Sequence, residues 1–246
     1  MRRSLLERLK FWKQGEIMPN WCYNTLEIRG KAAKIEKFMN GLKKYNDSYL
    51  LLESYIPCPQ ELSETLAHFQ DIGYDTFFNP DPSGYLKALE NSEIKKHGIK
   101  TREQLMQFLQ DEHPDSYENA LKVHNNLFKY GYRHRCDWSI ANWGTKWDVS
   151  DAELIRQDPE HLILEFDSAW SPPIRGLNSI AGLFPELEFY IEFEEPMIGF
   201  RGFAHWIRGE KIEEHCEDWY QFEEDEEISE SSNLSFQQNE EVSCLT

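Results

Sequence analysis

The sequence lacks the paired cysteines on which a disulfide-rich or zinc-bound fold is built. Its five cysteines are odd in number and include no CxxC pair; they are Cys22, Cys58, Cys136, Cys216 and Cys244. Structural zinc sites and small disulfide scaffolds need thiols at characteristic short spacings. We therefore expect reduced thiols, no metal site and no other cofactor.

Motifs for catalysis and nucleotide binding are also missing. The eight histidines form no HExxH or other ligand spacing, and GxSxG, GxxxxGK[ST] and GxGxxG do not occur. His134 lies close to Cys136 and Asp137, but adjacent residues in a strand point to opposite faces, so this nearness argues little for a site. The sequence therefore argues against an enzyme, but it does not decide whether the protein catalyses a reaction.

Long apolar runs are absent. None approaches the roughly 18–20 residues of a membrane span, and the mean hydropathy of −0.68 predicts a soluble protein. Together with the expected reduced thiols, this indicates a cytoplasmic one. Residues 1–17 are basic with a short apolar face, and they lack the apolar core and cleavage site of a signal peptide. We interpret them as a poorly ordered extension. A membrane-surface helix is the alternative, and Met18 is an alternative start.

Positive charge is scarce. The chain has 26 Lys and Arg against 44 Asp and Glu, a net charge of −18. Residues 210–246 hold 13 acidic residues and one lysine, a net of −12, which leaves −6 for the rest. This balance argues against sequence-independent nucleic-acid binding, which depends on clustered Lys and Arg. Dense like charge at 210–246 predicts a disordered tail.

What the sequence does contain is the pattern of an α+β fold. Alternating residues predict strands at 24–29, 162–168, 187–193 and 198–207, and the apolar run 48–56 is expected to be a further strand. Helical spacing predicts helices at 31–45 and after Ser171, with Ser171 as the cap. Residues 60–131 have the pattern of a helical insertion. The segments before and after this insertion each have a strand–helix–strand pattern. Together they predict a split β-α-β sandwich, an antiparallel sheet with helices on one face.

Several motifs resemble those of the Api92-like or YubB-like proteins. They are MPNWCYN at 18–24, IPCP at 56–59, NWGTKWD at 142–148, FDSAWSPP at 166–173, FPEL at 184–187, Glu195 and Gly202. The resemblance spans 18–209, with Ser168 where the family usually has threonine. It implies a ferredoxin-like domain over 18–209 and an origin on phages, plasmids or integrative elements, but no reaction. The scattered cysteines give no reason to expect an iron–sulfur cluster.

Tryptophans are concentrated in the same region. Trp138, Trp143 and Trp147 are three of the chain's eight; Gly144 and Thr145 suit a tight turn. Lys146 is suited to a cation–π contact. One interpretation is a ligand pocket or a protein-binding hot spot. The other is that these rings fill the space between sheet and insertion, with Lys146 and Asp148 paired locally.

A second segment lies where a strand ends and a helix begins. There, beside Trp170 and Ser171, a helix N-terminus can hold an anion, or Ser171 simply caps the helix. The two segments are expected to converge at one end of the sheet. The candidate ligand- or partner-binding residues are Trp143, Gly144, Thr145, Lys146, Trp147, Asp148, Trp170 and Ser171.

The outward face of the predicted sheet is rich in carboxylates, namely Glu27, Glu165, Asp167, Glu188 and Glu192. Such groups can bind a divalent cation or act as acid and base, although solvation is the ordinary explanation of outward charge. RNA-binding sheets place aromatic and basic residues on this face. Only Tyr190 and Arg29 fit that pattern, which argues against RNA.

Three functional hypotheses follow. The leading one is a non-enzymatic protein-binding or regulatory factor of a mobile genetic element, with an unidentified protein partner. The second is a small-molecule or nucleotide-binding enzyme that uses Lys146, Asp148 and Ser171. The third is an acidic DNA mimic that acts through the C-terminal tail.

Overall fold

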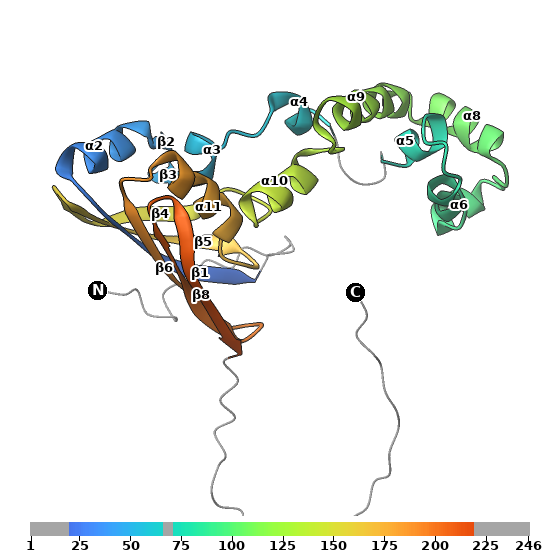
Figure 1. Cartoon of the computed structure of the whole chain (residues 1–246). Helices are drawn as coiled ribbons and strands as arrows, with labels where there is room; N and C mark the ends of the chain where they lie inside the picture. Colours follow the sequence, from blue (N-terminus) through green and yellow to red (C-terminus); the bar gives the residue numbers. More distant parts are fainter. Residues whose placement is uncertain (1–19, 66–70, 219–246) are drawn as a thin grey trace, which may run out of the picture.

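The computed structural model describes residues 20–65 and 71–218, and its centre is a six-stranded antiparallel sheet (Figure 1). The strand order is β4-β5-β1-β6-β7-β8. The strands are β1 (Trp21–Arg29), β4 (Ser150–Asp158), β5 (His161–Ala169), β6 (Glu188–Glu195), β7 (Phe200–Ile207) and β8 (Glu210–Asp218). The predicted α+β class and antiparallel sheet are confirmed.

Helices α2 (Ala32–Gly41) and α11 (Ile174–Leu183) cover one face of this sheet (Figure 1). The element order β1-α2-β4-β5-α11-β6, with the helical segment set aside, is the ferredoxin-like arrangement. Strand β1 alternates in burial along its length because its inward residues, such as Leu26 and Ile28, pack under the helices. The apolar stripe of α11, with Leu177 and Ile180, closes the core from above.

The prediction of a second sheet strand at 48–56 is wrong. Residues Ser48–Leu50 form β3, which pairs only with β2 (Lys43–Tyr45), and Leu51–Tyr55 form the short helix α3. Leu51 and Leu52 are both buried, whereas a strand turns adjacent side chains to opposite faces. The second-strand position of the main sheet is taken by β4, which the sequence pattern did not predict.

A helical arm extends sideways from the sheet (Figure 1). It runs through α4 (Gln60–Ser63), α5 (Asp71–Phe77), α6 (Ser83–Leu89), α7 (Ser92–Lys96), α8 (Arg102–Glu112), α9 (Asp115–Tyr130) and α10 (Arg135–Trp143). Its outer helices have a small core of their own, built on Ile94, Leu105 and Leu109. Gly131 ends α9 with φ of 78°. A further helix, α10, then runs to Trp143, beyond the predicted end of the insertion at 131.

The predicted tail from residue 210 begins with a strand. Arg208 and Gly209 have φ of 57° and 81°, the geometry of a tight hairpin turn with left-handed residues. This turn returns the chain as β8, whose residues are all exposed at the sheet edge. The remainder of the predicted tail, 219–246, and the basic extension 1–17 lie outside the described residues. Across the described ranges, no helix has the length and apolar character needed to cross a membrane.

The register brings the ends of several strands together at one end of the sheet. Trp21 pairs with Ala169, and Tyr23 pairs with Glu194. The start of β1 and the ends of β5 and β6 therefore lie together. Trp170, which follows β5, is placed at this edge.

Candidate functional site

Two of the clustered tryptophans are part of the core. The ring of Trp143 is 0% exposed, and its Nε1 donates a hydrogen bond to the Ile56 carbonyl at 3.0 Å. Trp138 packs edge-on against it, with ring centroids 5.3 Å apart. Gly176 of α11 lies so close to Trp143 that an added Cβ would be 3.4 Å from its carbonyl oxygen. These contacts join α10 to α11 and leave Trp143 no surface for a ligand.

The two predicted site segments, at 143–148 and 170–171, are connected through Gly144, Thr145 and Ser171. Gly144 ends α10 with φ of 84°, which favours glycine. The Thr145 hydroxyl donates to the Ala169 carbonyl at 3.0 Å, and the Ser171 hydroxyl donates to the Gly144 carbonyl at 2.9 Å. The predicted convergence of the segments is therefore present, and these two hydrogen bonds join them.

The predicted capping role of Ser171 is wrong. Helix α11 begins at Ile174, and its N-cap is Pro173, without a side-chain cap. Two consecutive prolines carry no N–H, so the chain enters the helix without the donors that a serine cap would satisfy. The Ser171 side chain turns instead toward Gly144.

The Asp148 side chain forms hydrogen bonds with the backbone. Its carboxylate accepts hydrogen bonds from the N–H groups of Leu52 at 2.9 Å, Glu53 at 2.8 Å and Val149 at 2.7 Å. It thus holds the first turn of α3. Burial of the carboxylate raises its pKa above the ordinary value, and the hydrogen bonds from Glu53 and its neighbours oppose this in part.

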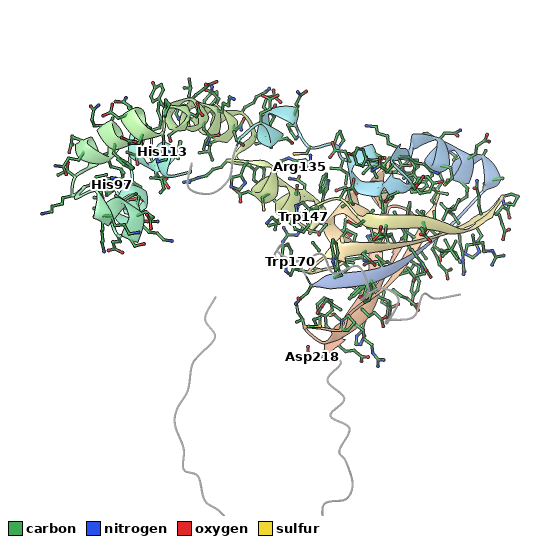
Figure 2. All side chains as sticks on the ribbon, turned by 180° about the vertical axis from the view of Figure 1, so that it is seen from behind. His97, His113, Arg135, Trp147, Trp170 and Asp218 are labelled. Carbon is green, nitrogen blue, oxygen red and sulfur yellow. The ribbon has the colours of Figure 1, made fainter. Side chains whose placement is uncertain are left out.

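Trp147 and Trp170 remain at the surface. They are 39% and 38% exposed, and their ring centroids are 5.5 Å apart with planes inclined by 30°. The Lys146 ammonium lies 5.1 Å from the Trp147 centroid and 5.5 Å from that of Trp170. Figure 2 shows both rings where the helical arm joins the sheet. We call Lys146, Trp147 and Trp170 the tryptophan–lysine surface.

The backbone holds Trp170 in an unusual conformation. Its φ is +64°, a left-handed geometry that costs a non-glycine residue roughly 1–3 kcal/mol. Its N–H donates to the Asn20 carbonyl at 2.8 Å, which fixes it next to the start of β1. This geometry places the Trp170 ring beside Trp147.

A hollow of about 210 Å³ adjoins Trp147. Its lining includes His134, Arg135, Cys136 and Lys146. The Arg135 guanidinium lies 3.0 Å from a Glu53 carboxylate oxygen. Burial raises the pKa of the Cys136 thiol, which keeps it neutral and makes it a poor nucleophile. Lys146 and Arg135 therefore place two cations in the lining of this hollow, and Glu53 pairs with one of them.

Sequence reasoning missed the residues of this hollow because it treated 134–137 as a strand. They are the start of α10, where His134 and Asp137 are one helical turn apart and lie 3.5 Å from each other. The available signal was apolar spacing of three residues, from Trp138 to Ala141 and from Ile140 to Trp143. Within the described ranges, no three His, Cys, Asp or Glu side chains come together as a possible metal site.

Comparison with known families identifies the second half of the fold. Residues 142–234 match the family model described as the ferredoxin-like domain in Api92-like protein. Over this range, which is less than half of the chain, the sequence is similar to that domain. The matched range begins at the tryptophan–lysine surface and includes β4 to β8.

One solved structure is similar, a crystal structure of protein Api92 from Yersinia pseudotuberculosis. It is 16% identical with a TM-score of 0.43, over 83% of this chain and 100% of that one. The comparison with curated proteins found no match.

Proposed function

We propose that this Api92-like chain is a non-catalytic factor of a mobile genetic element that binds a protein partner through the tryptophan–lysine surface. The observation that carries the proposal is the exposed pair Trp147 and Trp170, with Lys146 beside both rings. Exposed tryptophans held in a fixed arrangement are typical of binding hot spots, since they bury much area at little entropic cost. The mobile-element origin rests on the motif resemblance alone.

The support beneath this surface is rigid. Trp147 follows Thr145 and precedes Asp148, both of which are fixed by hydrogen bonds to backbone. Trp170 is fixed through its own N–H to Asn20. A surface arranged before binding loses less conformational entropy on association, which favours affinity.

The charge of the surface indicates the kind of partner. Lys146 forms no ion pair with a carboxylate of residues 20–65 or 71–218. The Arg175 guanidinium donates to the carbonyls of Ile140 and Ala141. Arg135 lines the adjoining hollow. These groups favour a partner that places an apolar side chain on the rings and a carboxylate near Lys146.

The geometry gives less support to a nucleotide-binding enzyme. That hypothesis used Lys146, Asp148 and Ser171 as reactive groups. Asp148 is engaged by three backbone N–H groups, and Ser171 by a backbone carbonyl. Only Lys146 faces the hollow. The DNA-mimic hypothesis depends mostly on residues 219–246, for which the structure gives no geometry.

Affinity capture with the full chain tests the proposal. Trp147→Ala/Trp170→Ala is compared with Tyr45→Ala/Phe128→Ala, which removes two aromatic residues that are 68% and 93% exposed elsewhere. Truncation of one hot-spot tryptophan costs about 2 kcal/mol, or about 30-fold in Kd. We expect the first variant to lose a partner that the wild type and the control retain. Identical partner sets for all three proteins would refute the proposal.

A further inference from the structure

The sheet face opposite α2 and α11 carries a second surface. Thr25 of β1 pairs with Glu165 of β5 on one side and with Glu192 of β6 on the other. Glu192 pairs with Phe203 of β7, and Phe203 pairs with His215 of β8. Residues paired across strands share one face of a sheet. Because the alternate residues of β1 are buried under the helices, this row of side chains lies on the opposite face, which we call the open face.

A hollow of about 500 Å³ runs along this row. Its lining comes from β5, β1, β6, β7 and β8, so the hollow is five strands wide. Neighbouring strands are about 4.8 Å apart, which gives a span of about 19 Å. An extended peptide advances about 3.3 Å per residue and would cross this span with about six residues. A single small cation would leave most of the hollow unfilled.

Aromatic rings lie beside the carboxylates of the open face. The rings of Tyr190 and Phe203 stack with centroids 5.8 Å apart, and the His215 ring lies 5.9 Å from that of Phe203. Tyr190 and Phe203 are half-buried, so part of each ring reaches solvent. An arginine or lysine side chain over such a ring gains a cation–π interaction. The rings therefore attract a cation independently of the carboxylates.

Three carboxylates give the hollow a surplus of negative charge. Glu165, Glu192 and Glu194 line it, and residues 20–65 and 71–218 provide no ion-pair partner for them. Arg201, by contrast, is paired with Glu217 at 2.6 Å. The open face therefore combines aromatic rings with carboxylates whose charge a cationic partner would complement.

The surplus of charge affects neighbouring groups. Burial, followed by the charge of Glu192, raises the pKa of Tyr190. Glu153 of β4 pairs with Glu165, and like charges that face each other across strands destabilise a sheet. A cationic partner would relieve this repulsion. A nucleic acid would add to it, because its phosphates would meet the carboxylates.

We propose that the open face binds an extended, arginine-bearing segment of a partner protein. Its guanidinium groups meet Glu165, Glu192 and Glu194, and one of them stacks on the rings of Tyr190 and Phe203. The planar guanidinium suits both contacts, since it forms paired hydrogen bonds with carboxylates and stacks on aromatic rings. An extended segment turns every second side chain to the same side, so alternate residues face the hollow. The proposal is independent of the tryptophan–lysine surface, which favours a carboxylate.

Carboxyl labelling of the full chain, by a carbodiimide and an amine, tests this inference with a synthetic peptide. The peptide has blocked termini and alternates Arg and Thr over about eight residues, enough to cross the hollow. It contains no amine or carboxylate that the reagents would couple. Labelling rates at Glu165, Glu192 and Glu194 are read by peptide mass spectrometry. Glu36 and Glu112, which are exposed on helices, serve as reference sites.

With the peptide at about ten times its Kd, labelling of the three face carboxylates should slow about tenfold, and labelling of the reference sites should not change. The Kd is read from the dependence of these rates on peptide concentration. Phe203→Leu removes a ring without changing the charge and should raise the Kd about two- to fivefold. Phe128→Leu, a control on the arm at a ring that is 93% exposed, should leave the Kd unchanged.

Three results would overturn the proposal. The first is no slowing at the face carboxylates, or equal slowing at the reference sites. The second is a Kd that Phe203→Leu leaves unchanged. The third is equal protection by acetyl-arginine amide at the same concentration of guanidinium groups, because the face would then recognise a lone cation rather than an extended segment.

Discussion

The indole rings of Trp147 and Trp170 lie with centroids 5.5 Å apart. The segments that carry them are joined by the hydrogen bonds from Thr145 to Ala169 and from Ser171 to Gly144. One ring follows α10 and the other follows β5. The pair is therefore a product of the tertiary fold, and each ring keeps more than a third of its surface in solvent. Its contribution to stability should be separable from its contribution to binding.

Alanine substitution should distinguish the buried tryptophan from the exposed ones. Trp143→Ala should lower the free energy of unfolding by about 3–5 kcal/mol, because it leaves a large cavity. Trp147→Ala should lower it by about 1 kcal/mol, since its ring is partly solvated and surface changes are small. Urea denaturation followed by far-UV circular dichroism measures both. Equal losses would contradict the division between core and surface.

Glycine should be the best tolerated replacement at position 170. The φ of +64° at Trp170 strains any side chain with a Cβ, and glycine avoids a cost of about 1 kcal/mol. Trp170→Gly should therefore be more stable than Trp170→Ala, the reverse of the usual order. The two variants lose the same ring, so the difference in melting temperature isolates the backbone effect. If alanine is the more stable, the strain is absent.

Asp148 should make stability depend on pH. Burial raises its pKa in the folded protein above the ordinary value of 3.8, so the folded state holds the proton more tightly than the unfolded state. Stability then falls as pH rises from 3.8 through the folded pKa, and levels off above it. Asp148→Asn removes this titration. The difference between wild type and Asp148→Asn in unfolding free energy should decrease with pH over that window; a difference that grows would contradict the sign.

Gly202 should be required where β7 meets β8. A Cβ at this position would contact the His215 carbonyl oxygen and lie 2.7 Å from Cζ of Phe193. Backbone cannot move aside as a flexible side chain can, so Gly202→Ala should cost about 1–3 kcal/mol. Gly182→Ala is the control, because an added Cβ there meets nothing within 4 Å. Equal stability of the two variants would show that the β7–β8 pairing tolerates the methyl group.

Part of the fold was predictable because burial alternates regularly in it. Strand β1, and β5 as far as Ser168, alternate between buried and more exposed residues. Helix α11 carries its apolar stripe at helical spacing. These are local patterns that one face of a sheet or helix imposes on the sequence.

Other elements could not be predicted because their pattern is set by tertiary context. Strand β4 has register shifts at Ser150/Glu153 and Leu154/Arg156 that break its alternation. Strand β8 has no buried residue, and it exists because Arg208 and Gly209 form a hairpin turn. Leu51 and Leu52 resembled a strand, but Asp148, distant in sequence, holds them in a helix.

The sequence predicted that the candidate segments lie together, but not which of their residues are buried. The tryptophan segments do converge, as the two strand ends at one sheet edge predicted. Which rings are exposed depends on α10 packing against α11, and no local pattern records this. Trp143 and Asp148 consequently belong to the support, and Lys146, Trp147 and Trp170 to the surface.

Site-specific photocrosslinking tests the central claim most directly. A photoreactive phenylalanine analogue is placed at position 147 or, as a control, at Tyr45 of the full chain. We predict a discrete crosslinked protein from position 147, which is lost when Trp170→Ala is added and is absent from position 45. No crosslink at 147, or the same crosslinked protein from both positions, would contradict the claim that the tryptophan–lysine surface binds the partner.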